Sequence, residues 1–183
     1  MNIDQKTIGD AAKGDPQAFE RIVHHYSLGI VRYVCNMIGD QHAAEDVAQR
    51  VFVNLYRSIK KFDVSRGSFN TWLYRIARNA ALNHLRDNRP HQTLLLTTQD
   101  ELVSEESPSS NAELREQFAQ LDAAVAALPD AQRSAWVLTE IEGLTQAQIS
   151  AIEGVPEGTI KSRVSRARET LLKSLQNEIG MER

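Results

Sequence analysis

The sequence has little cysteine and no long apolar run, and these absences limit the classes of protein to which the chain can belong. With one cysteine, Cys35, in 183 residues the chain cannot form an internal disulfide, which is typical of a protein from a reducing cytoplasm. A membrane-spanning helix needs about 18 consecutive apolar residues, and no such run occurs. The first residues are polar and include acids, so no secretory signal is expected. We therefore expect a cytoplasmic protein without membrane insertion.

Motifs for enzymatic chemistry are also missing. The sequence has no glycine-rich phosphate-binding loop, no Cys-x-x-Cys pair and no His-Glu-x-x-His motif. The adjacent His24 and His25 would point about 100° apart on a helix, so they cannot hold one metal ion from a single face. We expect that the chain is not an enzyme and has neither a cofactor nor a metal site.

Proline and glycine are scarce, at 5 and 9 residues, and 42% of the chain is hydrophobic, which is ordinary for a globular protein. The net charge of −3 hides a segregation of charge. Residues 45–89 carry nine lysines and arginines against four acids, and residues 161–168 are basic again. Between them, residues 100–116 carry six acids against Arg115 alone. Two basic regions joined by an acidic connector suit a nucleic-acid-binding protein.

Helical spacing of apolar residues predicts an all-α fold. We expect two small helical domains joined by a flexible acidic linker, the second being a helix-turn-helix domain. The predicted boundaries are 1–90, 91–111 and 112–183. Asp15-Pro16 begins one helix and Gly39-Asp40 ends the apolar stretch after it. Further helices are expected at 45–59, 67–90, 112–128 and 131–142, followed by the helix-turn-helix.

The expected helix over 67–90 separates two faces. Ser68 can cap its start, and Asn88-Arg89-Pro90 should stop it, because the residue before a proline avoids the α region. At about 100° per residue, apolar side chains gather on one arc, and cations and amides gather on another. The apolar arc comprises Phe69, Trp72, Leu73, Ile76, Ala77 and Ala80, and the second arc comprises Arg75, Asn79, Leu82, Arg86 and Arg89.

The second arc has two interpretations. It can be the solvated face of an ordinary amphipathic helix, or it can offer cations to phosphates and an amide to a base edge. The second is favoured because the arc lacks acids and because Lys60, Lys61, Phe62 and Arg66 precede it in an expected loop. Cations beside an exposed aromatic ring are what a single-stranded nucleic acid requires.

Residues 143–168 predict a helix-turn-helix. Thr145 can cap a short helix, Gly154 provides the turn and Pro156 begins a second helix. Its outer face carries cations that suit the DNA major groove. The alternative is a packed helical hairpin with a solvated basic face. The inward residues are Ile160, Val164, Ala167 and Leu171, and the outward ones are Lys161, Ser162, Arg163, Arg166 and Arg168.

The linker between the two regions contains an apolar island, Leu94–Leu96, among polar residues. It can pack on the first domain, which we favour slightly, or dock on a partner.

With these segments in view, the chain resembles bacterial RNA polymerase sigma factors of the extracytoplasmic-function group. The resemblance is carried by EDVAQRVFVNLYRSI, GSFNTWLYRIARNAALNHLR and GLTQAQISAIEGVPEGTIKSRVSRARETL. It implies a factor that binds core RNA polymerase and recognises the minus-35 and minus-10 promoter elements. Such a factor helps to separate the DNA strands and is usually held inactive by an anti-sigma factor.

The resemblance also implies roles for individual residues. Contacts to core polymerase would come from Asp46, Gln49, Arg50, Phe52 and Tyr56. The minus-10 strand would be held by Lys61, Phe62, Arg66, Arg75, Asn79, Asn83 and Arg86. The minus-35 duplex would be read by Thr159, Lys161, Ser162, Arg163, Arg166 and Arg168.

Three residues depart from the family pattern. Arg50 stands where an acid is usual, and Gln148 and Ser150 replace a common Glu and Ala. Two alternatives to the sigma-factor interpretation remain at this point. One is a helix-turn-helix regulator that binds duplex DNA without polymerase, and the other is an adaptor that binds polymerase but no longer opens promoters.

Overall fold

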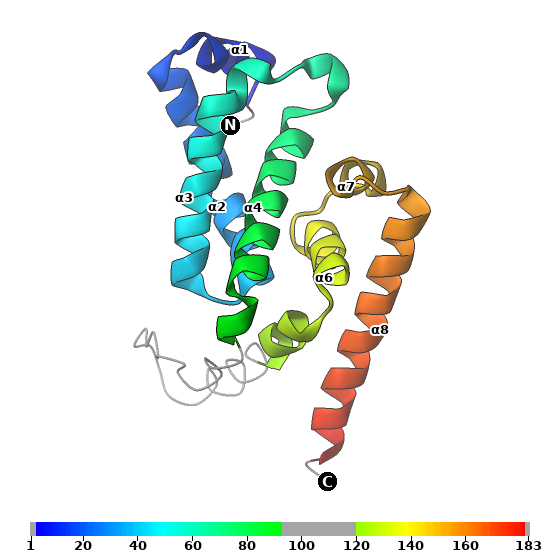
Figure 1. The fold of residues 1–183 in the computed structure, drawn as a ribbon. Helices are drawn as coiled ribbons and strands as arrows, with labels where there is room; N and C mark the ends of the chain where they lie inside the picture. The colour runs from blue at the N-terminus through cyan, green and yellow to red at the C-terminus, as the bar shows by residue number, and fades with distance from the viewer. Residues whose placement is uncertain (1–2, 93–119, 182–183) are drawn as a thin grey trace, which may run out of the picture.

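The computed structural model describes residues 3–92 and 120–181, and every regular element in those ranges is helical. Two groups of helices lie side by side (Figure 1). The all-α prediction is confirmed. The predicted linker 91–111, with Leu94–Leu96, lies outside the described residues apart from its first two positions.

The first group contains α1 (Gln5–Lys13), α2 (Pro16–Ile38), α3 (Gln41–Ser58) and α4 (Phe69–Gln92). Aspartates at 4, 15 and 40 cap the first three of these helices by accepting hydrogen bonds from amides of the first turn. Helices α2, α3 and α4 pack on one another, and α1 packs across α2. Helix α1 was missed in the sequence, although Asp4 and the left-handed Gly14 mark its two ends.

The segment between α3 and α4 is more ordered than the expected loop. It forms two short 3₁₀ helices, η1 (Ile59–Lys61) and η2 (Val64–Arg66). The Phe62 ring is half-buried, and its centroid lies 5.3 Å from those of both Phe69 and Trp72. Phe62 is therefore part of an aromatic cluster and is not a freely exposed ring.

Helix α4 begins as predicted and ends later than predicted. Ser68 Oγ accepts from the Thr71 amide at 3.1 Å, which confirms the cap. The helix continues through Pro90 to Gln92, so the predicted stop at Pro90 was wrong. A proline this close to a helix end removes only one intrahelical hydrogen bond, that to the Arg86 carbonyl, so the helix tolerates it.

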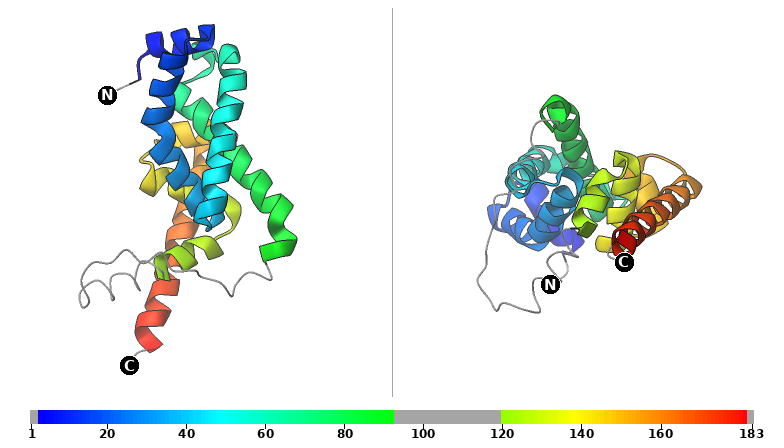
Figure 2. Two further views of the ribbon diagram at one scale, coloured as in Figure 1. Left: turned by 90° about the vertical axis from the view of Figure 1, so that its left-hand side faces the viewer. Right: turned by 90° about the horizontal axis from the view of Figure 1, so that it is seen from below.

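The second group begins with a helical stretch over 120–127 and ends with the helix-turn-helix. It contains α6 (Asp130–Trp136), the π-helical segment η3 (Val137–Ile141), α7 (Gln146–Glu153) and α8 (Glu157–Met181). The C-terminal part of α8 extends beyond the body of the molecule (Figure 2).

The helix expected over 131–142 was wrong in its second half, because it changes to the π-helical segment η3. The Thr139 hydroxyl donates to the Ala135 carbonyl at 2.7 Å, and a side chain that bonds the carbonyl four residues earlier bends a helix. The Glu142 amide then donates to the Val137 carbonyl, five residues back, at 3.1 Å. This wider turn carries Glu142 to the first group of helices.

Two of the three departures from the family pattern have a structural role here. Gln148 completes a capping box with Thr145, in which each side chain bonds the other residue's backbone amide. The Ser150 hydroxyl donates to the Val155 carbonyl at 2.6 Å and so closes the turn around Gly154, whose φ is 69°. The predicted turn and the four predicted inward residues of α8 are confirmed, since all four are buried.

The two groups share one continuous hydrophobic core. Helix α2 packs against α6 and η3, and α4 packs against α7. The two expected helical units are therefore held directly against one another in this structure (Figures 1 and 2).

Candidate nucleic-acid interface

Helix α4 presents the residues expected to hold the minus-10 strand on its outer side. Arg75, Asn79, Asn83 and Arg86 are all exposed, as is Lys61 in η1. The Arg66 side chain is not among those that the structure describes. The expected absence of acids near these cations was only partly right, because Arg86 Nε lies 3.3 Å from Asp87 Oδ1. Asp87 is on the same helix and exposed, so this contact is weak.

The basic side of α8 is less uniform than predicted. Lys161 and Arg166 are exposed, whereas Thr159 and Ser162 are half-buried. Two cations of the expected face already have acidic partners. Arg163 Nη1 lies 3.0 Å from Glu153 Oε2, and Arg168 Nη2 lies 2.5 Å from Glu140 Oε1. The prediction of an almost unbalanced cationic face was therefore wrong for Arg163 and Arg168, because the preceding helices supply acids that the spacing within α8 does not reveal.

The outer face of α3 carries most of the residues expected to contact polymerase. Asp46, Gln49 and Arg50 are exposed, Phe52 is half-buried, and Tyr56 is 60% exposed. The Tyr56 ring meets Phe19 edge-on, with centroids 5.1 Å apart. Val53, which the sequence analysis did not assign, is 47% exposed on the same face, and its spacing from Gln49 and Tyr56 could have indicated it.

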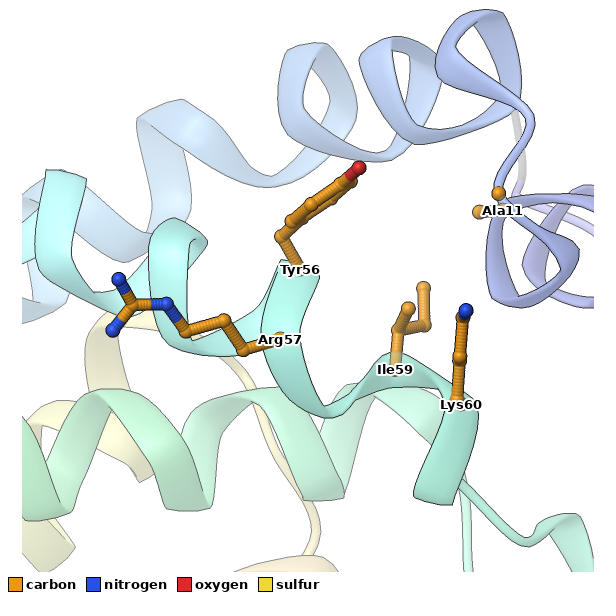
Figure 3. Close-up of a pocket in the computed structure, with 6 residues that line it drawn as sticks. Ala11, Tyr56, Arg57, Ile59 and Lys60 are labelled. Carbon is orange, nitrogen blue, oxygen red and sulfur yellow. The ribbon is translucent and has the colours of Figure 1, made fainter.

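A shallow hollow opens where α1 meets the end of α3 and η1 (Figure 3). Tyr56, Arg57 and Lys60 border it, and Ala11 of α1 and Gly14, which follows that helix, line it as well. This surface continues the outer face of α3 and adds two cations to it.

A buried polar cluster joins the two helix groups. Glu153, at the end of α7, has a fully buried carboxylate side chain. Its Oε1 accepts from Arg78 Nε at 2.9 Å and from Ser134 Oγ at 2.5 Å, and its Oε2 accepts from Arg78 Nη2 and Arg163 Nη1, each at 3.0 Å. Ser134 also shares a 2.9 Å hydrogen bond with the Tyr33 hydroxyl of α2. Sequence analysis counted Arg78 among the cations of its region but gave it no role.

Glu142 forms a second polar contact between the groups. Its Oε1 accepts from Arg32 Nε at 2.8 Å and its Oε2 from the Tyr74 hydroxyl at 2.5 Å. Burial, together with the Glu142 carboxylate, raises the pKa of Tyr74, so the phenol remains a hydrogen-bond donor at neutral pH.

The Arg75 guanidinium donates to the Ala151 carbonyl of α7, so α7 covers part of the α4 face in this structure.

Residues 22–91 match the family described as Sigma-70 region 2, and residues 118–171 match Sigma-70, region 4. The chain is 34% identical over 182 residues to the ECF RNA polymerase sigma factor SigW of Bacillus subtilis, covering 94% of this chain and 97% of that protein. It belongs to the ECF sigma factor family.

Other relatives agree with this assignment. The RNA polymerase sigma-H factor of Pseudomonas aeruginosa is 37% identical over 185 residues, with 94% of each chain covered. The solved structure of CnrH in complex with the cytosolic domain of CnrY superposes with a TM-score of 0.74 over 96% of this chain and 99% of that one. Its 23% identity supports the shared fold alone. This ECF sigma factor is therefore a transcription initiation factor, and the matched region 2 disfavours a regulator that only binds duplex DNA.

Proposed function

We propose that this ECF sigma factor binds core RNA polymerase, recognises the minus-35 and minus-10 promoter elements and promotes strand opening, without catalysing a covalent step. The work would be divided among residues 1–90 for polymerase and minus-10 binding, 91–111 as linker, and 112–183 for minus-35 binding. The observation that carries the proposal is the match of both sigma regions to the two helix groups. The exposed polar faces of α3, α4 and α8 then provide three separate surfaces.

An anti-sigma factor is the further partner that we propose. A structure sharing this fold, with a TM-score of 0.67 and 24% identity, is the sigma factor RpoE bound to the anti-sigma factor NepR from Bartonella quintana. Core polymerase would place the site of action in the cytoplasm. No helix within residues 3–92 and 120–181 is long and apolar enough to cross a bilayer. In the same ranges, no three His, Cys, Asp or Glu side chains are grouped so that they could hold a metal ion.

Run-off transcription tests the proposed function directly. Purified core polymerase would be given the DNA upstream of this protein's own gene, with and without the protein. A discrete transcript that needs the protein supports the proposal and locates both promoter elements. Without a transcript, gel filtration separates the alternatives. Co-elution with core would favour the adaptor or a different promoter, and no co-elution would contradict polymerase binding.

We expect Arg166→Ala to weaken binding to the minus-35 duplex by about 1–3 kcal/mol, the usual worth of a bidentate base contact. Arg166 is an exposed arginine on the face of α8 expected to read the minus-35 duplex. Fluorescence anisotropy on the mapped minus-35 duplex and on a scrambled duplex would measure the change. Lys173→Ala, two turns further along α8, is the matched control and should have little effect. An equal loss on both duplexes would make Arg166 a phosphate contact and contradict base reading.

We expect Asn79→Ala to impair strand opening by about tenfold while core binding is unchanged, because a lost amide contact to a base costs about 1–3 kcal/mol. Asn79 is exposed on the outer side of α4. Permanganate reactivity of promoter thymines reports opening, and co-elution with core reports polymerase binding. Asn54→Ala, an exposed asparagine on α3, serves as the control. Unchanged thymine reactivity would remove Asn79 from the minus-10 site.

A further inference from the structure

One buried carboxylate binds an arginine from each of the two helices proposed to contact DNA. Glu153 accepts from Arg78 of α4 through both oxygens, at 2.9 and 3.0 Å, and from Arg163 of α8 at 3.0 Å. The Glu153 side chain is fully buried, while those of Arg78 and Arg163 are 21% and 22% exposed. The two arginine side chains are therefore partly exposed at the edge of the interface.

The geometry of the Arg78–Glu153 pair is the one that arginine uses for phosphate. A guanidinium donates two parallel hydrogen bonds from Nε and Nη2, and a carboxylate or a phosphate accepts them equally well. On α4, Arg78 is one turn from Arg75 and next to Asn79, both assigned to the proposed minus-10 strand contact. A bound strand would therefore bring its phosphates to the position that the Glu153 carboxylate occupies here.

We propose that Arg78 is a further DNA-binding residue of this sigma factor. In the free protein, in its closed form with the two helix groups packed together, the Glu153 carboxylate binds the Arg78 guanidinium in place of a DNA phosphate. This inference rests on the proposed function of α4. When the two helix groups separate, Glu153 keeps Arg163 and Ser134, which belong to its own group. Arg78 loses both of its hydrogen bonds to Glu153, keeps only the 3.4 Å contact with Asn79 Oδ1 on its own helix, and becomes available to the backbone of the strand. While the two groups are packed together, the Arg78–Glu153 contact therefore reduces the affinity of the free protein for DNA.

Helix α2 offers an independent way to open the same interface. A Cβ at Gly29 would lie 2.9 Å from the Tyr74 hydroxyl and 3.3 Å from Glu142 Oε2. Gly29 is inside a helix, where alanine is the better residue. Gly29→Ala therefore disturbs the Tyr74–Glu142 contact between the groups without touching Arg78 or Glu153 and without weakening α2.

The test uses the full chain without polymerase. Affinity for a fluorescein-labelled oligo(dT) strand is measured by anisotropy, since a phosphate contact does not depend on base sequence. The radius of gyration from small-angle X-ray scattering reports separation of the groups. The variants are Glu153→Gln, Arg78→Gln, the double variant and Gly29→Ala. Asp87→Asn is the matched control, because it also removes an acid beside an arginine of α4 but does not bridge the groups.

Glu153→Gln is expected to increase the radius of gyration, because the two helix groups separate. It should also raise the affinity for oligo(dT) about tenfold, which corresponds to about 1.4 kcal/mol. Arg78→Gln should increase the radius of gyration equally but raise the affinity much less than Glu153→Gln, because separation then uncovers Arg75 but not Arg78. The double variant should match Arg78→Gln. Asp87→Asn should change neither quantity appreciably. If Glu153→Gln fails to fold by circular dichroism, Gly29→Ala takes its place and should raise the affinity in the same way.

Two results would overturn the proposal. If Glu153→Gln, or Gly29→Ala in its place, behaves like Asp87→Asn, the carboxylate does not mask DNA binding. If Arg78→Gln gains as much affinity as Glu153→Gln, Arg78 is a structural residue and makes no contact with the strand. Run-off transcription with the unchanged protein is a separate readout, so failure of the inference is distinguishable from failure of the proposed sigma function.

Discussion

Arg133→Met is expected to lower the free energy of unfolding by about 3–5 kcal/mol, because buried backbone carbonyls would lose their hydrogen bonds from a charged donor. The residue is 7% exposed on α6. Its Nη1 donates to the Met37 carbonyl at 2.6 Å, and its Nη2 donates to the carbonyls of Leu128 and Ala126. Burial lowers the pKa of Arg133, but an arginine remains charged at neutral pH.

The expected loss of stability is large because all three carbonyls lie at the C-terminal ends of helices. Met37 lies in the last turn of α2, and Ala126 and Leu128 lie at the end of the 120–127 helix, where carbonyls have no intrahelical partner. One guanidinium therefore caps two helix ends and complements both helix dipoles. Methionine matches much of the volume but donates no hydrogen bond, so these buried carbonyls would be left unsatisfied.

Thermal unfolding followed by circular dichroism would show the loss as a decrease in Tm on the order of 10 °C for a chain of this size. Arg21→Met, an exposed arginine on α2, is the matched control and should change Tm by no more than a few degrees. Arg133→Lys keeps the positive charge but not the forked arrangement of donors, so its Tm should lie between those of Arg133→Met and Arg21→Met. Equal Tm values for Arg133→Met and Arg21→Met would contradict the capping role.

Arg133 also illustrates a kind of contact that cannot be predicted from the sequence, namely one between residues far apart in the chain. Local signals worked because their partners are close in the chain, as with Asp15 at the start of α2 and the Thr145 cap before the Gly154 turn. Apolar spacing likewise predicted the buried side of α8, and on α4 it was right for Phe69, Leu73 and Ala77, whereas Trp72, Ile76 and Ala80 are only half-buried. Spacing assigns a residue to a face, however, and does not say what lies opposite that face.

The contacts between the two helix groups were therefore beyond prediction. Arg78 and Glu153 are 75 residues apart in sequence, and no local pattern links the two side chains. The π-helical turn that brings Glu142 to Tyr74 has no composition signal of its own in a stretch whose apolar spacing is that of a regular helix. Spacing separated the faces of α4 and α8, and the family resemblance assigned the residues on α3, whereas the packing of α4 against α7 and of α2 against α6 and η3 required the tertiary structure.

The outer face of α3 supplies the second large prediction, which rests on the proposed polymerase contact. We expect Tyr56→Ala to weaken binding to core polymerase by about 2 kcal/mol or more, roughly 30-fold, because large aromatic residues at the centre of an interface carry much of its binding energy. Tyr56 is 60% exposed, and its edge contact with Phe19 holds the ring in place before binding. A pre-oriented ring loses little rotational freedom when it is buried, so most of its apolar area contributes to affinity.

Titration of fluorescently labelled core polymerase with each variant would measure the loss. Leu172→Ala is the matched control, because Leu172 is 59% exposed on α8 and lies outside the proposed contact. Tyr56→Phe keeps the ring and should retain most of the affinity. A loss for Leu172→Ala as large as that for Tyr56→Ala would mean that any exposed apolar residue suffices. Unchanged binding by Tyr56→Ala would move the polymerase contact away from this part of α3, because Val53 alone offers too little apolar area to replace the ring.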